Sequence, residues 1–180
     1  MRTLLILFVF IVMVTPAVAQ VGPDTIGLWF DTEYTVNIFD PGAAPFQAYL
    51  VLHEPTADNV VAMEFALQWP VELMVLDATW NGSPVVYGGY DCLTASYPSP
   101  LPATEGTLLA TFQLMLPSAI SDGLVMVEAC PAHPCAYYQD SFMQQYCLET
   151  TFGGGVVACL GDCSVSNEAA SWSSIKSLYR

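Results

Sequence analysis

Basic residues are almost missing from this sequence of 180 residues, which has three Lys and Arg side chains against 17 Asp and Glu. Arg2 lies near the start, and Lys176 and Arg180 lie at the end, so the long stretch between them has no cation. A surface without cations cannot neutralise phosphates, which argues against nucleic acid and anionic membranes as partners. Only 11% of the residues are charged and 54% are hydrophobic, so the composition favours a packed domain over a disordered acidic tail.

Signatures of catalysis are missing as well. The sequence has no Gly-x-Ser-x-Gly elbow, no phosphate-binding loop, no dinucleotide fingerprint and no haem motif. The two histidines, His53 and His133, have no partner in a recognisable catalytic motif, and we interpret them as strand-end and loop residues. Carboxylates are plentiful, but nothing singles out two of them as a glycosidase pair. We therefore predict no catalytic residue, no metal site and no cofactor.

Acid-rich turns leave one alternative open, a weakly bound structural Ca²⁺. Turn carboxylates are normally solvated, and that is the interpretation we favour here. The turns concerned are Asp31-Thr32-Glu33, Asp40 and Asp58-Asn59.

Long apolar runs are confined to the first residues of the chain. Arg2 precedes an unbroken apolar run over residues 4–14, and Ala17-Val18-Ala19 forms a small-residue cleavage site. The run is too short for a transmembrane helix, which needs about 20 residues. We predict that residues 1–19 are a signal peptide and that the protein is extracellular or at the cell surface, with the periplasm as the alternative.

Six cysteines follow the predicted signal peptide. An even number in an oxidising compartment predicts disulfide bonds but leaves their connectivity open. Zinc is the alternative, because Cys130-Pro-Ala-His133-Pro-Cys135 and Cys159-Leu-Gly-Asp-Cys163 resemble ligand knuckles, but the compartment favours disulfides. Since five of the six lie in residues 130–163, we expect the bridges to staple loops at one end and not the core strands. The six are Cys92, Cys130, Cys135, Cys147, Cys159 and Cys163.

Short segments of alternating polarity recur along the chain, with Gly, Pro and Asp between them. This pattern predicts an all-β fold, a two-sheet antiparallel β-sandwich of jelly-roll or immunoglobulin-like type, in one domain over residues 20–163. The predicted strands lie in residues 26–30, 34–38, 46–52, 107–116, 124–129 and 156–160.

The segment from Val60 to Trp80 has two interpretations. At helical spacing, Glu64, Gln68 and Glu72 would form a polar stripe, whereas at a spacing of two the apolar residues fall on one side. Pro70 would lie inside such a helix and destabilise it by about 3 kcal/mol, but it is tolerated between strands. We therefore predict two strands, one over residues 60–69 and the next beginning near residue 73.

Two regions, residues 81–104 and 131–150, have the composition of loops and contain most of the tyrosines. Exposed loop tyrosines could stack on sugar rings, but aromatic side chains more often fill the core. The candidates for a binding surface are Tyr87, Tyr90, Tyr97, Tyr137 and Tyr138.

The predicted strand pair resembles a cohesin segment. Phe65-x-Leu67-x-Trp69-Pro70-x-x-Leu73-x-Val75 is similar to the cohesin pattern in which Phe-x-Leu-x-Tyr precedes an Asp-Pro turn and Leu-x-Val, although Trp69 stands where the turn has Asp. A second segment, Gly106-Thr-Leu-Leu-Ala-Thr-Phe-x-Leu114 followed by Ser121-Asp122-Gly123, resembles a later cohesin strand and turn. The order and spacing also match related carbohydrate-binding modules, and the resemblance extends from Gly27 to Val127.

The resemblance implies a non-enzymatic domain that binds a protein partner or a surface matrix. A carbohydrate-binding module that uses the loop tyrosines to bind polysaccharide is the alternative, and a carboxylate-dependent glycan-active enzyme comes third. Neither the partner nor the oligomeric state follows from the sequence.

The C-terminal tail, residues 164–180, is the one segment with helical spacing. Ser171 suits an N-cap, and the last residues resemble the W-G-x-[IV]-K-x-L-Y-R endings of uncharacterised secreted bacterial proteins, with Ser173 in place of Gly. So short a helix needs tertiary contacts, so we expect it to pack on its own domain, with a sorting or attachment tag as the alternative. Its functional residues are Trp172, Ile175, Lys176, Leu178, Tyr179 and Arg180.

Overall fold

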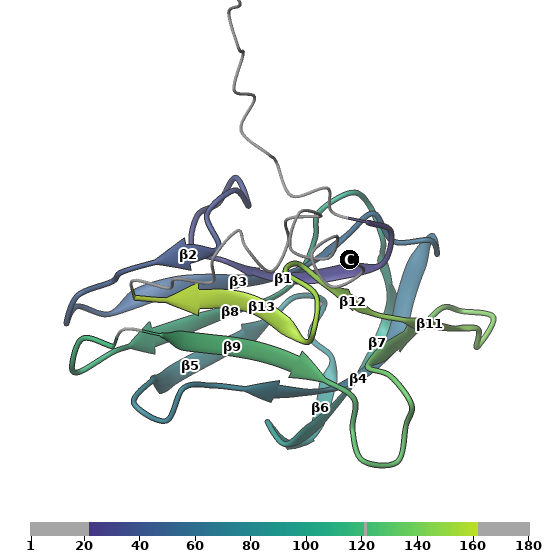
Figure 1. Cartoon of the computed structure of the whole chain (residues 1–180). Helices are drawn as coiled ribbons and strands as arrows, with labels where there is room; N and C mark the ends of the chain where they lie inside the picture. Colours follow the sequence, from purple (N-terminus) through teal and green to yellow (C-terminus); the bar gives the residue numbers. More distant parts are fainter. Residues whose placement is uncertain (1–21, 121, 162–180) are drawn as a thin grey trace, which may run out of the picture.

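Thirteen strands and no helix make up the residues that the computed structural model describes, 22–120 and 122–161 (Figure 1). They form two facing sheets, so the predicted all-β sandwich is confirmed. No helix in these two ranges is long and apolar enough to cross a membrane. The predicted signal peptide, the predicted C-terminal helix and Cys163 lie outside the described residues.

The first sheet has five strands. In spatial order they are β12 (Glu149–Thr150), β1 (Thr25–Trp29), β3 (Phe46–His53), β8 (Thr107–Met115) and β5 (Met74–Trp80). All neighbours are antiparallel except β1 and β12, which run parallel.

The second sheet has eight strands. Its main path is β11 (Gln145–Cys147), β10 (Tyr137–Gln139), β4 (Asn59–Gln68), β9 (Gly123–Glu128), β13 (Val156–Leu160) and β2 (Ile38–Phe39). Both β10 and β9 pair with one edge of β4, at successive residues. The other edge of β4 pairs with β7 (Cys92–Pro102), and β7 pairs with the outermost strand, β6 (Val85–Gly89). Because β13 and β2 run parallel, this sheet is mixed like the first, where the sequence predicted antiparallel sheets.

Alternation along each strand builds the core between the sheets. In β4, Met63, Phe65 and Leu67 point inward and are buried, while Glu64 and Gln68 point outward. Because β4 extends from Asn59 to Gln68 and ends before Pro70, the prediction of a strand over residues 60–69 is confirmed. Burial of each large apolar side chain contributes about 1.5–3 kcal/mol, which is why the alternating pattern determines the layer structure.

The interpretation of residues 81–104 as a loop is wrong, since β6 and β7 occupy most of them. That interpretation relied on Pro98, Pro100 and Pro102, which are unusual within a strand. The register between β7 and β4 shifts between Val60 and Ala62, opposite Leu101 and Ser96, so the chain around Pro98 and Pro100 passes without regular pairing. At such an irregularity, proline costs no ladder hydrogen bond.

The predicted strand over residues 34–38 is also largely wrong, because only Ile38 joins a strand. The Asp31 carboxylate accepts hydrogen bonds from the backbone N–H groups of Thr35 and Val36, at 2.9 and 2.8 Å. Tyr34 has a φ of 56°, in the left-handed region. These contacts make the segment a tight turn rather than an extended strand. Residues 131–150 contain the short strands β10, β11 and β12 as well as loops.

Candidate functional site

Four side chains form a line across the outer face of the second sheet. The strand registers place Tyr87 of β6 opposite Thr94 of β7, Thr94 opposite Glu64 of β4, and Glu64 opposite Tyr137 of β10. Directly paired residues of antiparallel strands point to the same face. Because Met63 and Phe65 on either side of Glu64 point into the core, all four point outward. We call this line the outer row.

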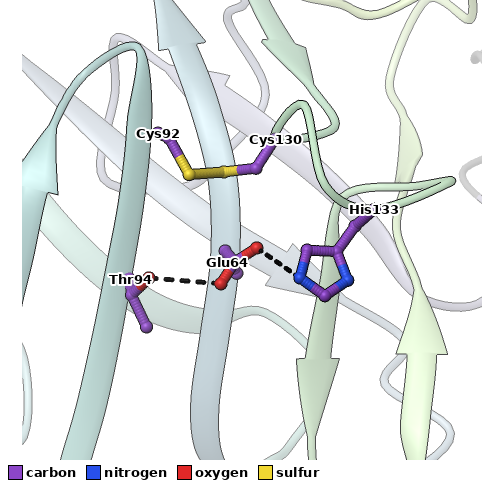
Figure 2. The surroundings of a disulfide bond; sticks show 5 residues. All are labelled: Glu64, Cys92, Thr94, Cys130 and His133. Atoms are coloured by element: carbon purple, nitrogen blue, oxygen red, sulfur yellow. Dashed lines mark hydrogen bonds and ion pairs between the residues drawn. A yellow bond between two sulfur atoms is a disulfide. The ribbon is translucent and has the colours of Figure 1, made fainter.

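The Glu64 carboxylate contacts both His133 and Thr94 (Figure 2). Its Oε1 lies 3.0 Å from Nε2 of His133, and its Oε2 accepts a hydrogen bond of 3.3 Å from the Thr94 hydroxyl. The ring of His133 also lies against the Tyr137 ring, with centroids 5.0 Å apart. The loop between β9 and β10 is thereby attached to the face of β4.

The pKa of Tyr137 depends on its burial and on the neighbouring Glu64. Burial raises the pKa of the Tyr137 phenol above its ordinary value, and the charge of Glu64 and a hydrogen bond to it raise the pKa further. The phenol therefore stays protonated and can donate to the carboxylate at all physiological pH values. Both partners of the Glu64–His133 pair remain partly accessible.

The Cys92–Cys130 disulfide lies beside this cluster and ties the start of β7 to the loop that follows β9 (Figure 2). A second disulfide joins Cys135, two residues before β10, to Cys147, the last residue of β11. Cys159 is disulfide-bonded too. The disulfide prediction is confirmed for these residues. The expectation that the bridges staple loops and not the core strands is wrong, because Cys92, Cys147 and Cys159 lie in strands β7, β11 and β13.

Glu64, Cys92 and Cys130 are the one group of metal-ligand residue types within 4.8 Å in the described ranges. Thiolates, not disulfide sulfurs, bind metals, so oxidation of both cysteines leaves a single carboxylate. The zinc alternative also fails at Cys130 and Cys135, since each is bonded to a different cysteine. Nothing in this cluster resembles a nucleophile with its base, because His133 pairs with a carboxylate and not with a hydroxyl.

The five predicted tyrosines do not come together on one surface. Tyr87 is 61% exposed, and Tyr137 shares the outer row with it. Tyr97 and Tyr138, by contrast, are 6% and 1% exposed and belong to the core cluster. Tyr90 packs against the core, with its ring 6.0 Å from that of Trp69. The accessible tyrosines therefore lie on the face of a sheet and not on a loop surface as predicted. Tyr87 and Tyr137 are the two of the five that remain available to a ligand.

Sequence reasoning missed Val85, Glu64 and His133 as parts of this face. Val85 is half exposed and lies two residues from Tyr87 on the same side of β6. The available signal was the strand propensity of Val85, Val86 and Tyr87 in succession, but the nearby glycines and prolines obscured it. The approach of His133 to Glu64 depends on the path of a loop, which no local pattern indicates.

A second group of exposed apolar residues lies at the β10–β11 turn, at the end of the molecule opposite β2 (Figure 1). Phe142 is 87% exposed and Met143 is also exposed, with a φ of 63°. The buried Asp140 carboxylate holds the turn by accepting hydrogen bonds from the backbone N–H groups of Phe142 and Gln144, both at 2.9 Å. The turn is thus rigidly built although its tip is apolar and solvated.

A cleft of about 310 Å³ opens near the β9 end, with Glu128, Glu149, Gly154 and Gly155 in its lining. None of the buried polar atoms that lack a partner in the described ranges lies in this lining.

Solved structures with a similar fold are cohesins. The sixth cohesin of Acetivibrio cellulolyticus scaffoldin B, solved in complex with a Cel5 dockerin, aligns with a TM-score of 0.52 at 10% identity over 76% of this chain and 96% of its own. The cohesin module of a Clostridium perfringens family 33 glycoside hydrolase gives 0.50 at 12% identity over 70% and 91%. CaCohA2 from Clostridium acetobutylicum gives 0.50 at 11% identity over 79% and 94%.

No protein-family model matches the chain, and no curated protein matches it significantly. The structural similarity nevertheless shows a cohesin-like fold, which confirms the resemblance identified in the sequence. At these identities the comparison establishes the fold and not the partner.

Proposed function

We propose that this cohesin-like β-sandwich is a non-enzymatic interaction module that binds a protein partner through the outer face of β6, β7, β4 and β10. The observation that carries the proposal is the outer row, in which the exposed Tyr87 and the hydrogen-bonded Glu64 lie on either side of Thr94. Tyrosine is enriched at the energetic centres of protein interfaces because it combines a large apolar ring with a polar end.

The rigidity of the face supports the proposal. A disulfide, a ladder of paired strands and the Glu64–His133 contact hold the side chains in place before a partner arrives. A preorganised surface loses little conformational freedom on binding, and the saved entropy appears as affinity. Val85 and Tyr87 of β6 supply the apolar area, while Thr94 of β7 and Glu64 of β4 supply polar groups on the two neighbouring strands.

The partner's chemistry follows from charge. Residues 22–161 contain no Lys or Arg, so a partner surface with cations around an apolar centre is complementary to this face. A dockerin is bound to the cohesin of Acetivibrio cellulolyticus, and a dockerin-like module is the finer form of our proposal. The disulfides fit an oxidising compartment, and we place the protein outside the cell or at its surface.

Carbohydrate binding is the second candidate, favoured by the placement of Tyr87 and Tyr137 in one row. Three strand spacings of about 4.8 Å separate their backbones, roughly 14 Å in all, a distance that an extended polysaccharide can bridge. The third candidate, a carboxylate-dependent glycan-active enzyme, gains no support from a particular pair of acids.

Binding measurements with face variants test the proposal. The wild type, the double variant Val85→Ser/Tyr87→Ala and the control Val71→Ser are each immobilised and exposed to surface proteins of the producing cells and to a polysaccharide panel. Val71 is 93% exposed but lies outside the face, so it matches the loss of an exposed valine. We expect one saturable protein ligand that binds wild type and control alike and the double variant at least tenfold more weakly, as for a tyrosine hot spot.

Two outcomes contradict this expectation. Equal binding by all three proteins would show that the docking surface lies elsewhere on the molecule. Binding of a polysaccharide that is lost in Tyr87→Ala and in Tyr137→Ala would instead establish the carbohydrate-binding candidate.

A further inference from the structure

The outer face of the first sheet is apolar where β1 and β3 meet. The register places Trp29 opposite Tyr49, Gly27 opposite Val51, and Thr25 opposite His53, all on the side away from the core cluster. An outward face of an antiparallel sheet normally bears polar side chains. We call Trp29, Tyr49, Val51 and His53 the β1–β3 face.

The turn before β2 adds an aromatic side chain to this face. The Tyr34 ring lies 6.2 Å from the Tyr49 ring and 6.3 Å from the His53 ring, and the Trp29 indole lies 5.2 Å from His53 on the other side. The Asp31 carboxylate holds the turn in position. The rings of Trp29 and Tyr34 therefore both contact His53, and the ring of Tyr49 lies next to Tyr34, an arrangement that is more typical of an interface than of a solvated sheet.

Two polar atoms on the face lack partners. Trp29 is only 6% exposed, and in the described part of the chain neither its Nε1 nor the Nε2 of His53 has a hydrogen-bond partner. A buried donor without an acceptor destabilises the fold, and native proteins rarely leave one. Burial lowers the pKa of His53, opposed by the charges of Glu54 and Glu105, so its ring is neutral at pH 7.

Carboxylates surround this apolar area. Glu54 and Glu105 are close enough to act on His53, and Glu149 of β12 lies opposite Thr25 of β1. No cation lies in residues 22–161 to balance them. A segment that combines an apolar stripe, hydrogen-bond acceptors and positive charge would complement all three properties of the face.

We propose that residues 167–180 of the same chain dock on the β1–β3 face. This segment has Trp172, Ile175, Leu178 and Tyr179 for the apolar contact, and it holds Lys176 and Arg180, the sole cations after Arg2. Its backbone carbonyls offer acceptors to Trp29 Nε1 and to His53. The inference stands apart from the proposed function, which concerns the other sheet.

The chain is long enough to reach the face. The described part ends at Gly161, whose N–H bonds to the carbonyl of Phe39 beside β2. Ten residues in extended form span roughly 33–36 Å, whereas the two sheets lie about 10 Å apart and the five strands of the first sheet span about 20 Å. Residues 162–171 therefore allow the following residues to reach β1 and β3 without strain.

Lys176 provides the test, because it is the only lysine in the sequence. The full mature chain is treated with a carbodiimide, which couples an amine directly to a touching carboxylate, and the products are mapped by mass spectrometry. We expect Lys176 to be joined to Glu54 or Glu105 within one chain, in a yield that does not depend on protein concentration. The yield should fall several-fold in about 1 M salt, where charges are screened beyond about 3 Å.

Tail variants decide whether the apolar contact matters. Trp172→Ser/Leu178→Ser should lower the yield at least about tenfold, since each large buried side chain is worth that much in binding. Ser173→Ala changes a polar neighbour and should leave the yield unchanged, while Lys176→Gln should abolish the product. Coupling mainly to carboxylates of another face, coupling only between chains, no coupling, or an unaffected double variant would each overturn the proposal.

Discussion

Nε2 of His133 lies 3.0 Å from Oε1 of Glu64, so a loop residue and a residue of a central strand form one contact on the outer face of the second sheet. The contact attaches the loop between β9 and β10 to β4. It also places a carboxylate against Tyr137, and this neighbour makes the contact measurable.

Glu64→Gln should lower the pKa of Tyr137. Burial, then the charge of Glu64 and the hydrogen bond to it, raise that pKa in the native protein, and the substitution removes the charge. Burial still acts, so the pKa should fall only part of the way toward its ordinary value near 10. Absorbance titration of wild type and variant, with Tyr137→Phe to assign the signal, measures the shift. Glu72→Gln is the control, and an identical shift there would contradict the assignment.

The protein should lose stability above about pH 10. Burial raises the pKa of Tyr97, and burial together with the hydrogen bond to Asp24 raises that of Tyr138. The folded state keeps these protons above pH 10 while the unfolded state releases them, so the free energy of unfolding is unaffected below pH 10 and falls above it. The slope for Tyr97 is about 1.4 kcal/mol per pH unit.

Tyr97→Phe checks this slope in urea-unfolding curves measured between pH 8 and 11.5. In the variant, the free energy of unfolding should fall less steeply with pH, by about 1.4 kcal/mol per pH unit. At pH 8 it should be at least as stable as the wild type, because the Tyr97 hydroxyl is buried without a partner among the described residues. Equal slopes in the two proteins would show that Tyr97 titrates normally.

Removal of the Cys92–Cys130 disulfide should destabilise the protein more than removal of Cys135–Cys147. The first closes a sequence separation of 38 residues and the second one of 12. Because a cross-link lowers the entropy of the unfolded chain, the first should stabilise the protein by about 4 kcal/mol and the second by about 3 kcal/mol. Denaturant unfolding of Cys92→Ala/Cys130→Ala and of Cys135→Ala/Cys147→Ala gives the comparison. The reverse order would show that native contacts of the hairpin outweigh chain entropy.

Asp24 and Tyr138 should be energetically coupled. The Tyr138 hydroxyl donates to the Asp24 carboxylate, which also accepts hydrogen bonds from the N–H and the hydroxyl of Thr56, both at 2.7 Å. Asp24 has a φ of 57°, which asparagine also tolerates, so Asp24→Asn changes the charge without backbone strain. A double-mutant cycle with Tyr138→Phe should give a coupling of about 1–2 kcal/mol. The pair Asp40→Asn/Tyr138→Phe should be additive.

Gly88→Ala should disrupt the end of β6 that supports Tyr87. A Cβ at Gly88 would lie 2.1 Å from the Cys92 carbonyl oxygen, and its φ is 81°. Gly153 shares a positive φ of 73° but has no atom within 4 Å, so Gly153→Ala isolates the backbone cost of about 1 kcal/mol. Thermal unfolding should show the larger loss for Gly88→Ala, and similar losses would contradict the contact.

The sandwich could be predicted because alternation in strands such as β4 is local information. Pro70 excludes a helix, and Met63, Phe65 and Leu67 fall on one side at a spacing of two. The strand β7 could not be recognised in this way. Its prolines are compatible with pairing only because the register to β4 shifts there, and that shift depends on the partner strand.

The site was less predictable than the fold. Tyr87 and Tyr137 were candidates, but the sequence did not indicate that Tyr97 and Tyr138 are buried. Burial of a tyrosine depends on which side of a strand it occupies, and a register shift of one residue reverses it. The pairing of Cys92 with Cys130 was equally inaccessible, because many connectivities are compatible with six cysteines.

The Cys135–Cys147 bridge has a consequence for how this protein can diversify. Its Cα atoms are 5.7 Å apart, so the segment that it encloses leaves and re-enters the sandwich at almost one place. Within that segment, residues 141–144 of the β10–β11 turn form a cassette whose length and sequence can change while β10, with its buried Tyr138, and β11 stay as they are. Exchange of this cassette between homologous proteins would be a direct route to new binding specificity on an unchanged scaffold.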